Sequence, residues 1–124
     1  MAQILIVDDE ENFRHVLKEI LEFAGHEVLE ANSGAQALEV YSSFRAELVM
    51  TDINMPGKDG IEIIMELRRD YPEVKIIAMS GGDIGNSRIE MAENLGADRI
   101  LDKPFYTREI LDAVELLLKK VNSA

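Results

Sequence analysis

The chain has 124 residues, of which 47% are hydrophobic and 30% are charged, so it is long and apolar enough to build one compact domain. It has no cysteine, which excludes disulfides, thiolate catalysis and zinc–thiolate sites. Its formal net charge of −11 disfavours direct binding to nucleic acid or to anionic membranes, and it favours cationic partners such as divalent metal ions or basic protein faces.

Five short apolar runs along the chain are typical of strands that are buried on both faces. The first, Ile4 to Val7, is followed directly by acids and is too short for a signal peptide or a membrane span. We therefore expect a cytoplasmic protein without a membrane segment. The other runs are Glu27–Glu30, Leu48–Met50, Val74–Met79 and Arg99–Leu101.

Amphipathic stretches between these runs predict helices. Apolar residues three and four positions apart predict one helix from Phe13 to Ala24, ended by Gly25, and another from Ile110 to Val121. The stretch from Asn86 to Leu95 has the weakest apolar stripe, and we expect it to be locally mobile.

Two further helices are marked by their starting residues. Ser33 with Gln36, and Asp59 with Glu62, have the spacing of capping boxes. The helix after Asp59 is expected to end before Pro72. Strand and helix then alternate five times, which predicts an α/β fold with a parallel sheet, helices on both faces and right-handed crossovers. We expect residues 1–124 to form a single domain.

Polar side chains stand where the predicted strands end. Asp8 and Asp9 follow the first strand, Asp52 the third, Ser80 the fourth and Lys103 the fifth. Functional sites in open parallel sheets form outside the carboxyl ends of the strands. We therefore expect three carboxylates, a hydroxyl and an ammonium to meet at one rim of the sheet. The alternative is a set of separate, individually solvated acids.

Such a cluster of carboxylates needs compensation. Two carboxylates ~4–5 Å apart repel by roughly 3–4 kcal/mol at an effective dielectric constant near 20. Lys103 would offset part of this charge, but we expect that it cannot serve several carboxylates at once. An oxygen-rich, sulfur-free donor set favours Mg²⁺, with Mn²⁺ as a second choice.

A carboxylate beside a divalent cation can attack phosphorus to form an acyl phosphate. The cation and Lys103 would spread the charge on the phosphoryl oxygens, and Ser80 could donate to one of them. Gly81 has no side chain to block a close approach. A turn at Pro56–Gly57 would hold Asp52 and direct the backbone of residues 53–55 toward the site, where a carbonyl could be another metal ligand.

Together these motifs resemble the receiver domain of bacterial two-component response regulators of the chemotaxis-regulator type. The resemblance covers essentially the whole chain, and its landmarks are Asp8-Asp9 after Ile4–Val7, Asp52 before Asn54-Met55-Pro56-Gly57-Lys58-Asp59-Gly60, Ser80, and Lys103-Pro104-Phe105. It implies a flavodoxin-like (βα)5 three-layer sandwich with a parallel five-stranded sheet in the order 2-1-3-4-5.

The resemblance also implies roles for the site residues. Asp52 would accept a phosphoryl group from a sensor histidine kinase. Asp9 and Asp52 would bind Mg²⁺ directly with the backbone carbonyl of Asn54, and Asp8 would act through water. Lys103 would contact the phosphoryl oxygens, and its bond to Pro104 would be cis.

The resemblance further implies a switch. The hydroxyl of Ser80 would move onto the phosphoryl group, next to Gly81. Many receivers carry Tyr or Phe three residues before the lysine, whereas this chain has Ile100. We therefore expect the signal to pass through the Ser80 loop and the helix at 86–95 rather than through an aromatic side chain.

In this interpretation the domain is a phosphoacceptor switch with slow self-phosphorylation and self-hydrolysis, not an enzyme with a metabolic substrate. Its partners would be a sensor histidine kinase or phosphotransfer protein and a downstream protein or its own effector domain, with dimerisation on phosphorylation left open. Three alternatives remain at this point. They are a metal-dependent phosphohydrolase, a flavin-binding module on the same fold, and a receiver that docks without phosphorylation.

Overall fold

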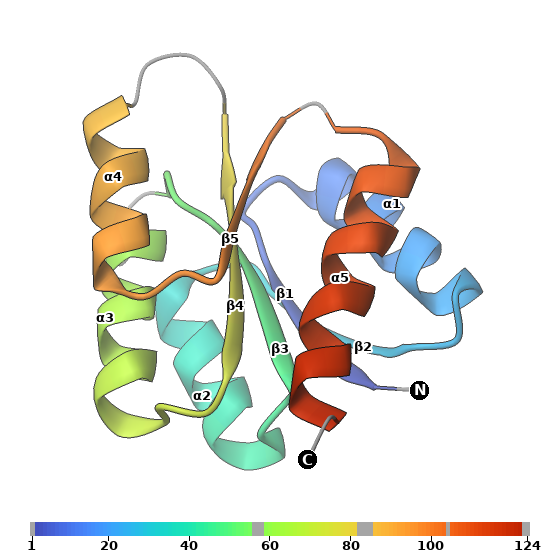
Figure 1. The fold of residues 1–124 in the computed structure, drawn as a ribbon, viewed down its shortest axis with the longest axis horizontal. Helices are drawn as coiled ribbons and strands as arrows, with labels where there is room; N and C mark the ends of the chain where they lie inside the picture. The colour runs from blue at the N-terminus through green and yellow to red at the C-terminus, as the bar shows by residue number, and fades with distance from the viewer. Residues whose placement is uncertain (1, 56–58, 82–85, 104, 123–124) are drawn as a thin grey trace.

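Strands and helices alternate along the chain in a computed structural model that describes residues 2–55, 59–81, 86–103 and 105–122 (Figure 1). The strands are β1 (Gln3–Val7), β2 (Glu27–Ala31), β3 (Leu48–Asp52), β4 (Lys75–Ser80) and β5 (Arg99–Asp102). The helices are α1 (Glu11–Phe23), α2 (Gly34–Phe44), α3 (Gly60–Asp70), α4 (Asn86–Leu95) and α5 (Thr107–Asn122). The predicted alternation is thus confirmed. Among the described residues, no helix has the length and apolar character needed to cross a membrane.

All neighbouring strands pair in parallel, in the order β2-β1-β3-β4-β5. This confirms the predicted flavodoxin-like fold and its strand order. Helices α2, α3 and α4 cover one face of the sheet and α1 and α5 cover the other (Figure 1). The register pairs Val7 with Thr51, Asp52 with Met79 and Ser80 with Asp102, so the carboxyl ends of four strands lie at one edge.

Each face of the sheet has its own core cluster, which explains why the three central strands are apolar along most of their length. Val49 and Ile76 lie in the cluster under α2, α3 and α4, whereas Met50 and Ile77 lie in the cluster under α1 and α5. All four side chains are 0% exposed. Successive residues of a strand point to opposite faces, so a strand that is covered on both faces has no position for a solvated side chain.

Helix starts and ends follow the capping signals with one difference. Gly25 follows α1 with a φ of 97°, and Asp59 and Glu62 form a complete capping box at α3. At α2 the Ser33 side chain accepts a hydrogen bond from the amide of Gln36, as predicted. The Gln36 side chain, however, accepts from the amide of Asn32 and not from that of Ser33.

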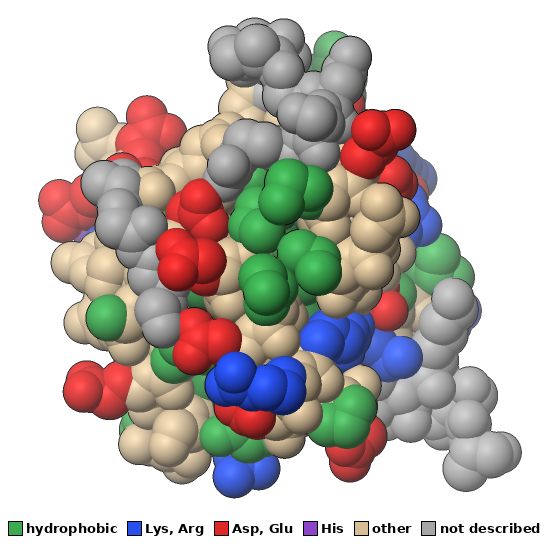
Figure 2. Space-filling view, turned by 90° about the vertical axis from the view of Figure 1, so that its left-hand side faces the viewer, with side chains coloured by type: hydrophobic (Ala, Val, Ile, Leu, Met, Phe, Trp, Pro, Cys, Tyr) green, Lys and Arg blue, Asp and Glu red, His purple; other side chains and the backbone are tan. Residues whose placement is uncertain are grey.

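Helix α4 is lightly packed at the level of its described side chains. Within residues 89–95, only Ala92 is fully buried, and Met91 is 47% exposed. Figure 2 shows hydrophobic side chains gathered on the face formed by α3 and α4, with charged side chains around them. A shallow groove on this face is lined by Glu62, Met65, Glu66, Arg68, Arg69 and Leu95.

Candidate functional site

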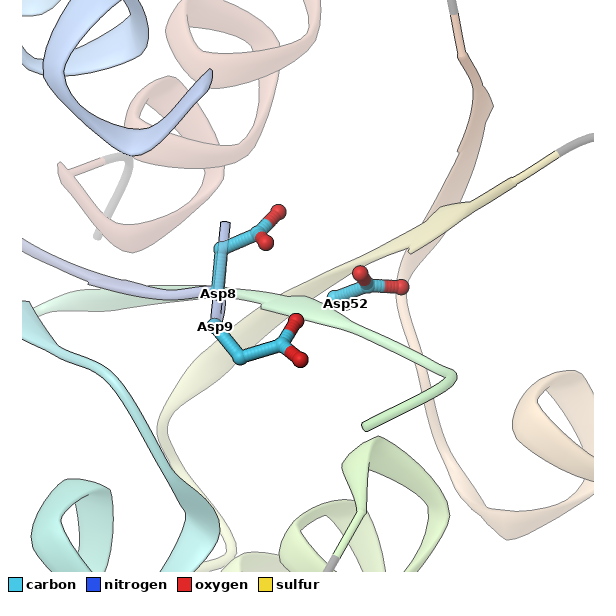
Figure 3. A group of neighbouring side chains, drawn as sticks. All are labelled: Asp8, Asp9 and Asp52. Atoms are coloured by element: carbon cyan, nitrogen blue, oxygen red, sulfur yellow. The ribbon is translucent and has the colours of Figure 1, made fainter. Parts of the chain in front are cut away.

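Three carboxylates meet at the carboxyl edge of the sheet (Figure 3). Asp8 and Asp9 follow β1 and Asp52 ends β3, and one oxygen from each lies within 4.8 Å of the others. Asp8 is 0% exposed and Asp52 is 7% exposed, whereas Asp9 is open to solvent. The predicted convergence of the three carboxylates is confirmed, and the alternative of separate, individually solvated acids is wrong. We call these three residues the acid pocket.

Lys103 contacts two of the three carboxylates at the same time. Its Nζ lies 2.9 Å from Asp8 Oδ2 and 3.3 Å from Asp52 Oδ2. The expectation that one lysine cannot serve several carboxylates is therefore wrong. An ammonium has three donors, and the parallel strands place both acceptor oxygens on the same side of it.

Burial and neighbouring charges shift the pKa values of Asp52 and Lys103. Burial raises the pKa of Asp52 and the charge of Asp8 adds to this, while the charge of Lys103 and the amide of Asn54 act in the opposite direction. Burial alone would lower the pKa of Lys103, but its hydrogen bonds and charge interactions with Asp8 and Asp52 outweigh this and raise it. Lys103 is therefore charged at neutral pH. For Asp52, in contrast, burial outweighs the favourable contacts and disfavours the ionised form.

Backbone groups fix the orientation of the two buried carboxylates. The amide of Asn54 donates to Asp52 Oδ1 at 3.1 Å, and the amide of Glu10 donates to Asp8 Oδ1 at 2.9 Å. Arg14 Nη1 donates to the backbone carbonyl of Asp8 at 2.8 Å. Sequence reasoning missed Arg14, although a basic residue in the first turn of α1, five residues after Asp9, is a signal that could have found it.

Gly60 is packed directly against the end of β3. Its amide donates to the carbonyl of Ile53 at 3.1 Å. A Cβ atom at Gly60 would overlap the backbone of Asp52 and of Ile53, closer than real Cβ atoms come to other atoms. The start of α3 thus approaches Asp52 so closely that only glycine fits. The sequence predicts a helix start here but does not reveal this contact.

The remaining predicted residues differ in how deeply they are buried. Ser80 is buried at the end of β4, and its carbonyl accepts from the amide of Lys103 at 2.8 Å. Gly81 is exposed, and a Cβ atom there would meet nothing within 4 Å. Ile100 is partly buried against the core cluster under α2, α3 and α4. The predicted cis bond involves Pro104, which lies outside the described residues, as do Pro56 and Gly57 of the predicted turn.

The donor set fits a hard divalent cation. Three carboxylates and one ammonium give the pocket a net charge of −2, and the metal ligands that its carboxylates offer are all oxygen atoms. Asp9 is exposed, which leaves a side open to an ion and its waters. The residues present therefore fit Mg²⁺, and they fit a thiolate-preferring metal poorly.

A parallel sheet in this strand order with an acid pocket beside a lysine defines a receiver-type signalling domain. The family described as the response regulator receiver domain matches residues 4–115. The aerobic respiration control protein ArcA of Escherichia coli is 38% identical over 96% of this chain, which spans 50% of that protein. The chemotaxis protein CheY of Halobacterium salinarum is 38% identical over 94% of this chain and 96% of its own length.

A solved structure supports the same assignment. The CheY-like receiver domain protein of Methanospirillum hungatei superimposes with a TM-score of 0.92 and 29% identity, covering 100% of this chain and 99% of its own. The chain belongs to the response regulator receiver domain family. Receivers of this family are signalling switches and bind Mg²⁺ at an acidic pocket. The phosphohydrolase and flavin-binding alternatives are thereby set aside.

Proposed function

We propose that residues 1–124 form one receiver domain in which Asp52 accepts a phosphoryl group from a sensor histidine kinase or phosphotransfer protein. The phosphorylated form would then signal to a downstream protein or to an effector domain. The observation that carries this proposal is the placement of Asp52. It ends β3 inside the acid pocket, and its Oδ2 lies 3.3 Å from Lys103 Nζ.

In the transfer step, a carboxylate oxygen of Asp52 attacks phosphorus while the phosphorus–nitrogen bond of the donor histidine breaks. The imidazole leaves with the electron pair of that bond and takes up a proton. Lys103 is close enough to turn its ammonium from Asp52 to an incoming phosphoryl oxygen.

Asp9 and Asp52 would hold Mg²⁺, or Mn²⁺ in its place, with the backbone carbonyl of Asn54, and Asp8 would contribute through a water molecule. When bound, the ion would neutralise the pocket and stabilise the charge on the phosphoryl oxygens. Lys103 supports the same arrangement, because its contact with Asp8 holds that carboxylate in place at the rear of the pocket.

The conformational response would start at Ser80, whose hydroxyl would move onto the phosphoryl group beside Gly81. Taking a switch from 1:99 to 99:1 requires ~5.5 kcal/mol of preference for the active state. A phosphoryl group brings roughly −1.5 to −2 charges at neutral pH, which supplies a strong local perturbation. With Ile100 in place of an aromatic residue, we expect the output to pass through the lightly packed helix α4. The cytoplasmic location and a phosphorylation-dependent dimer stay predictions.

The direct test is labelling with a small acyl-phosphate donor in the presence of Mg²⁺. Intact-mass measurement should show one added phosphoryl group on the wild type and none on Asp52→Asn. Asp112→Asn is a matched control, because Asp112 is exposed on α5, and it should be labelled like the wild type. An unlabelled wild type would favour the alternative of a receiver that docks without phosphorylation. Equal labelling of Asp52→Asn would place the acceptor elsewhere.

The same experiment tests the other parts of the proposal. Labelled wild-type protein should lose its phosphoryl group slowly, which is the self-hydrolysis expected of a switch. Rapid turnover of the donor with no adduct would instead indicate an enzyme. Asp9→Asn should raise the Mg²⁺ concentration needed for half-maximal labelling, because Asp9 would be a direct ligand.

A further inference from the structure

The ammonium of Lys103 has a third neighbour besides its two carboxylates. Its Nζ lies 4.1 Å from the centroid of the Phe13 ring, a distance at which the negative ring face attracts a cation. Phe13 belongs to the first turn of α1, so it reaches Lys103 from a part of the chain far from β5. The Lys103 side chain is only 16% exposed, and attraction to a ring is stronger where water is largely excluded.

The Phe13 ring is itself held in place. It makes an edge-on contact with Phe105, with ring centroids 5.7 Å apart and an interplanar angle of 75°. Both rings are packed against the core cluster under α1 and α5. Leu17, one helical turn after Phe13, is 1% exposed in that same cluster and anchors this face of α1. The ring face therefore presents a fixed surface to the ammonium.

We propose that Phe13 is a positioning residue for phosphoryl transfer, its ring face holding the Lys103 ammonium at the acid pocket. This inference rests on the proposed phosphorylation of Asp52. Lysine is a flexible chain that ends in a point charge, so its direction must be set by its surroundings. Asp8 holds it by a hydrogen bond and Phe13 by its ring face, while the ammonium also donates to Asp52.

The ring contact also suits a lysine that must change partners during the reaction. The hydrogen bond to Asp52 has to give way when that carboxylate becomes an acyl phosphate. Attraction to a ring face depends weakly on the direction of the N–H bonds, so it persists while the ammonium turns toward a phosphoryl oxygen. Phe13 would keep Lys103 in reach throughout, without itself touching the reacting atoms.

The test is the maximal rate of labelling by a small acyl-phosphate donor at saturating Mg²⁺. Phe13→Leu keeps an apolar side chain but removes the ring, and we expect the maximal rate to fall about tenfold, which is within the energy range of such contacts. Phe13→Tyr keeps the ring and should stay within about threefold of the wild type. Phe23→Leu is the matched control on the same helix, because Phe23 is 96% exposed, and it should change nothing.

Two further measurements separate positioning from general support of the fold. In a Lys103→Met background, Phe13→Leu should have no further effect, because the interaction it removes is already absent. Fluorinated phenylalanines at position 13 keep the shape and burial of the ring while weakening its negative face, so the logarithm of the rate should fall with the number of fluorines. This series also covers the case in which Phe13→Leu does not fold.

The outcomes distinguish this inference from the proposal on which it rests. A labelled wild type with an unaffected Phe13→Leu variant, additive losses with Lys103→Met, or rates that ignore fluorination would each overturn the role of Phe13 alone. An unlabelled wild type would overturn the phosphorylation of Asp52 and this inference with it. A fall in the rate that tyrosine rescues and fluorination grades would establish the role.

Discussion

The β1–α1 and β4–α4 sides of the acid pocket are packed very differently. On the first side Asp8 is 0% exposed, Phe13 lies against Lys103, and Leu17 fills the core below them. On the second side Gly81 faces open space, and Met91 of α4 is 47% exposed. One side holds Asp8 and Lys103 in a fixed arrangement, and the described residues of the other side have little packing that would resist movement.

Under the proposed function, this difference would separate phosphoryl transfer from signalling within one small domain. Groups that stabilise a transferring phosphoryl group work best when they are already in place, because no energy is then spent on rearranging them. Elements that report a state must have two arrangements of similar energy, and such elements come from the least stable parts of a fold. The contacts of the β1–α1 side fit the first requirement, and the light packing of the described β4–α4 residues is what the second would favour.

The strongest test of this comparison uses two glycines. We expect Gly60→Ala to have the largest effect on stability. Its new Cβ atom would overlap the backbone of Asp52 and Ile53, which no rotamer can relieve. We expect the free energy of unfolding to fall by about 4 kcal/mol, at the upper end of single substitutions. Urea denaturation measures this value, and labelling of Asp52 should fall in parallel.

Gly81→Ala is the matched control for stability, because its Cβ atom would meet nothing within 4 Å. We expect its free energy of unfolding to stay within about 1 kcal/mol of the wild type in either direction. Equal losses at the two glycines would show that the β4–α4 side is packed as tightly as the end of β3.

A second pair of variants compares the two helices directly. Leu17→Ala in α1 removes a side chain that is 1% exposed, and it should cost about 3 kcal/mol of unfolding free energy. Leu95→Ala in α4 removes a side chain that is only partly buried, and it should cost about 1 kcal/mol. Chemical denaturation of both variants provides the comparison, and a larger loss at Leu95 would reverse it.

The meeting of the three acids and Lys103 at one edge of the sheet was predictable, because the topology alone determines it. In a parallel sheet, residues at the carboxyl ends of neighbouring strands must meet, so Asp8, Asp9, Asp52 and Lys103 were expected together. The light packing of α4 was also predictable, since its stretch of sequence has few apolar residues in a regular stripe.

The contacts that arrange those side chains were not predictable from the pattern. Whether Phe13 lies over Lys103 depends on how α1 is rotated on the sheet and on which rotamer each side chain adopts. The bridge from Lys103 to both Asp8 and Asp52 depends on the same details. Gly60 reads as an ordinary helix start, and only the packed structure shows how close it comes to Asp52.

A third prediction concerns the stability that the folded protein loses by burying the carboxylate of Asp52. Its pKa is raised chiefly by burial, so the folded protein binds the proton of Asp52 more tightly than the unfolded chain does. As the pH rises above 3.8, the ordinary value for this carboxyl, unfolding becomes easier, and the cost is complete above the raised pKa. Asp52→Asn should therefore stabilise the protein at pH 7 in the presence of a chelator, by about 1 kcal/mol.

Thermal unfolding with and without Mg²⁺ checks this prediction. Mg²⁺ should stabilise the wild type, because a ligand that binds only the folded state adds to its stability. It should stabilise Asp52→Asn much less, since one of the proposed direct ligands is gone. A variant that is less stable than the wild type under chelation would show that the contact of Asp52 with Lys103 outweighs the cost of burying its charge.

The smallest expected effect lies at the edge of the fixed side, where Glu30 of β2 accepts from Arg14 at 2.9 Å and from Lys18 at 3.2 Å. Burial alone would raise the pKa of Glu30, but these two cations outweigh it and lower the pKa. The stabilisation is therefore complete above 4.5, the ordinary value, and is lost as the pH falls through the lowered pKa. Glu30→Gln should cost less than about 1 kcal/mol at pH 7, because such pairs contribute little.

Urea midpoints at several pH values measure this effect, and the gap between wild type and Glu30→Gln should close below the lowered pKa. Glu19→Gln, at an exposed position of α1, should show no such pH-dependent gap. Arg14 also donates to the carbonyl of Asp8. Glu30→Gln therefore also tests whether the ion pair between Arg14 and Glu30 matters to the acid pocket. If packing by Phe13 and Leu17 fixes this side, as the structure indicates, labelling of Asp52 should be unchanged in Glu30→Gln. A large drop in labelling would show that the ion pair, rather than packing in the core, keeps this side rigid.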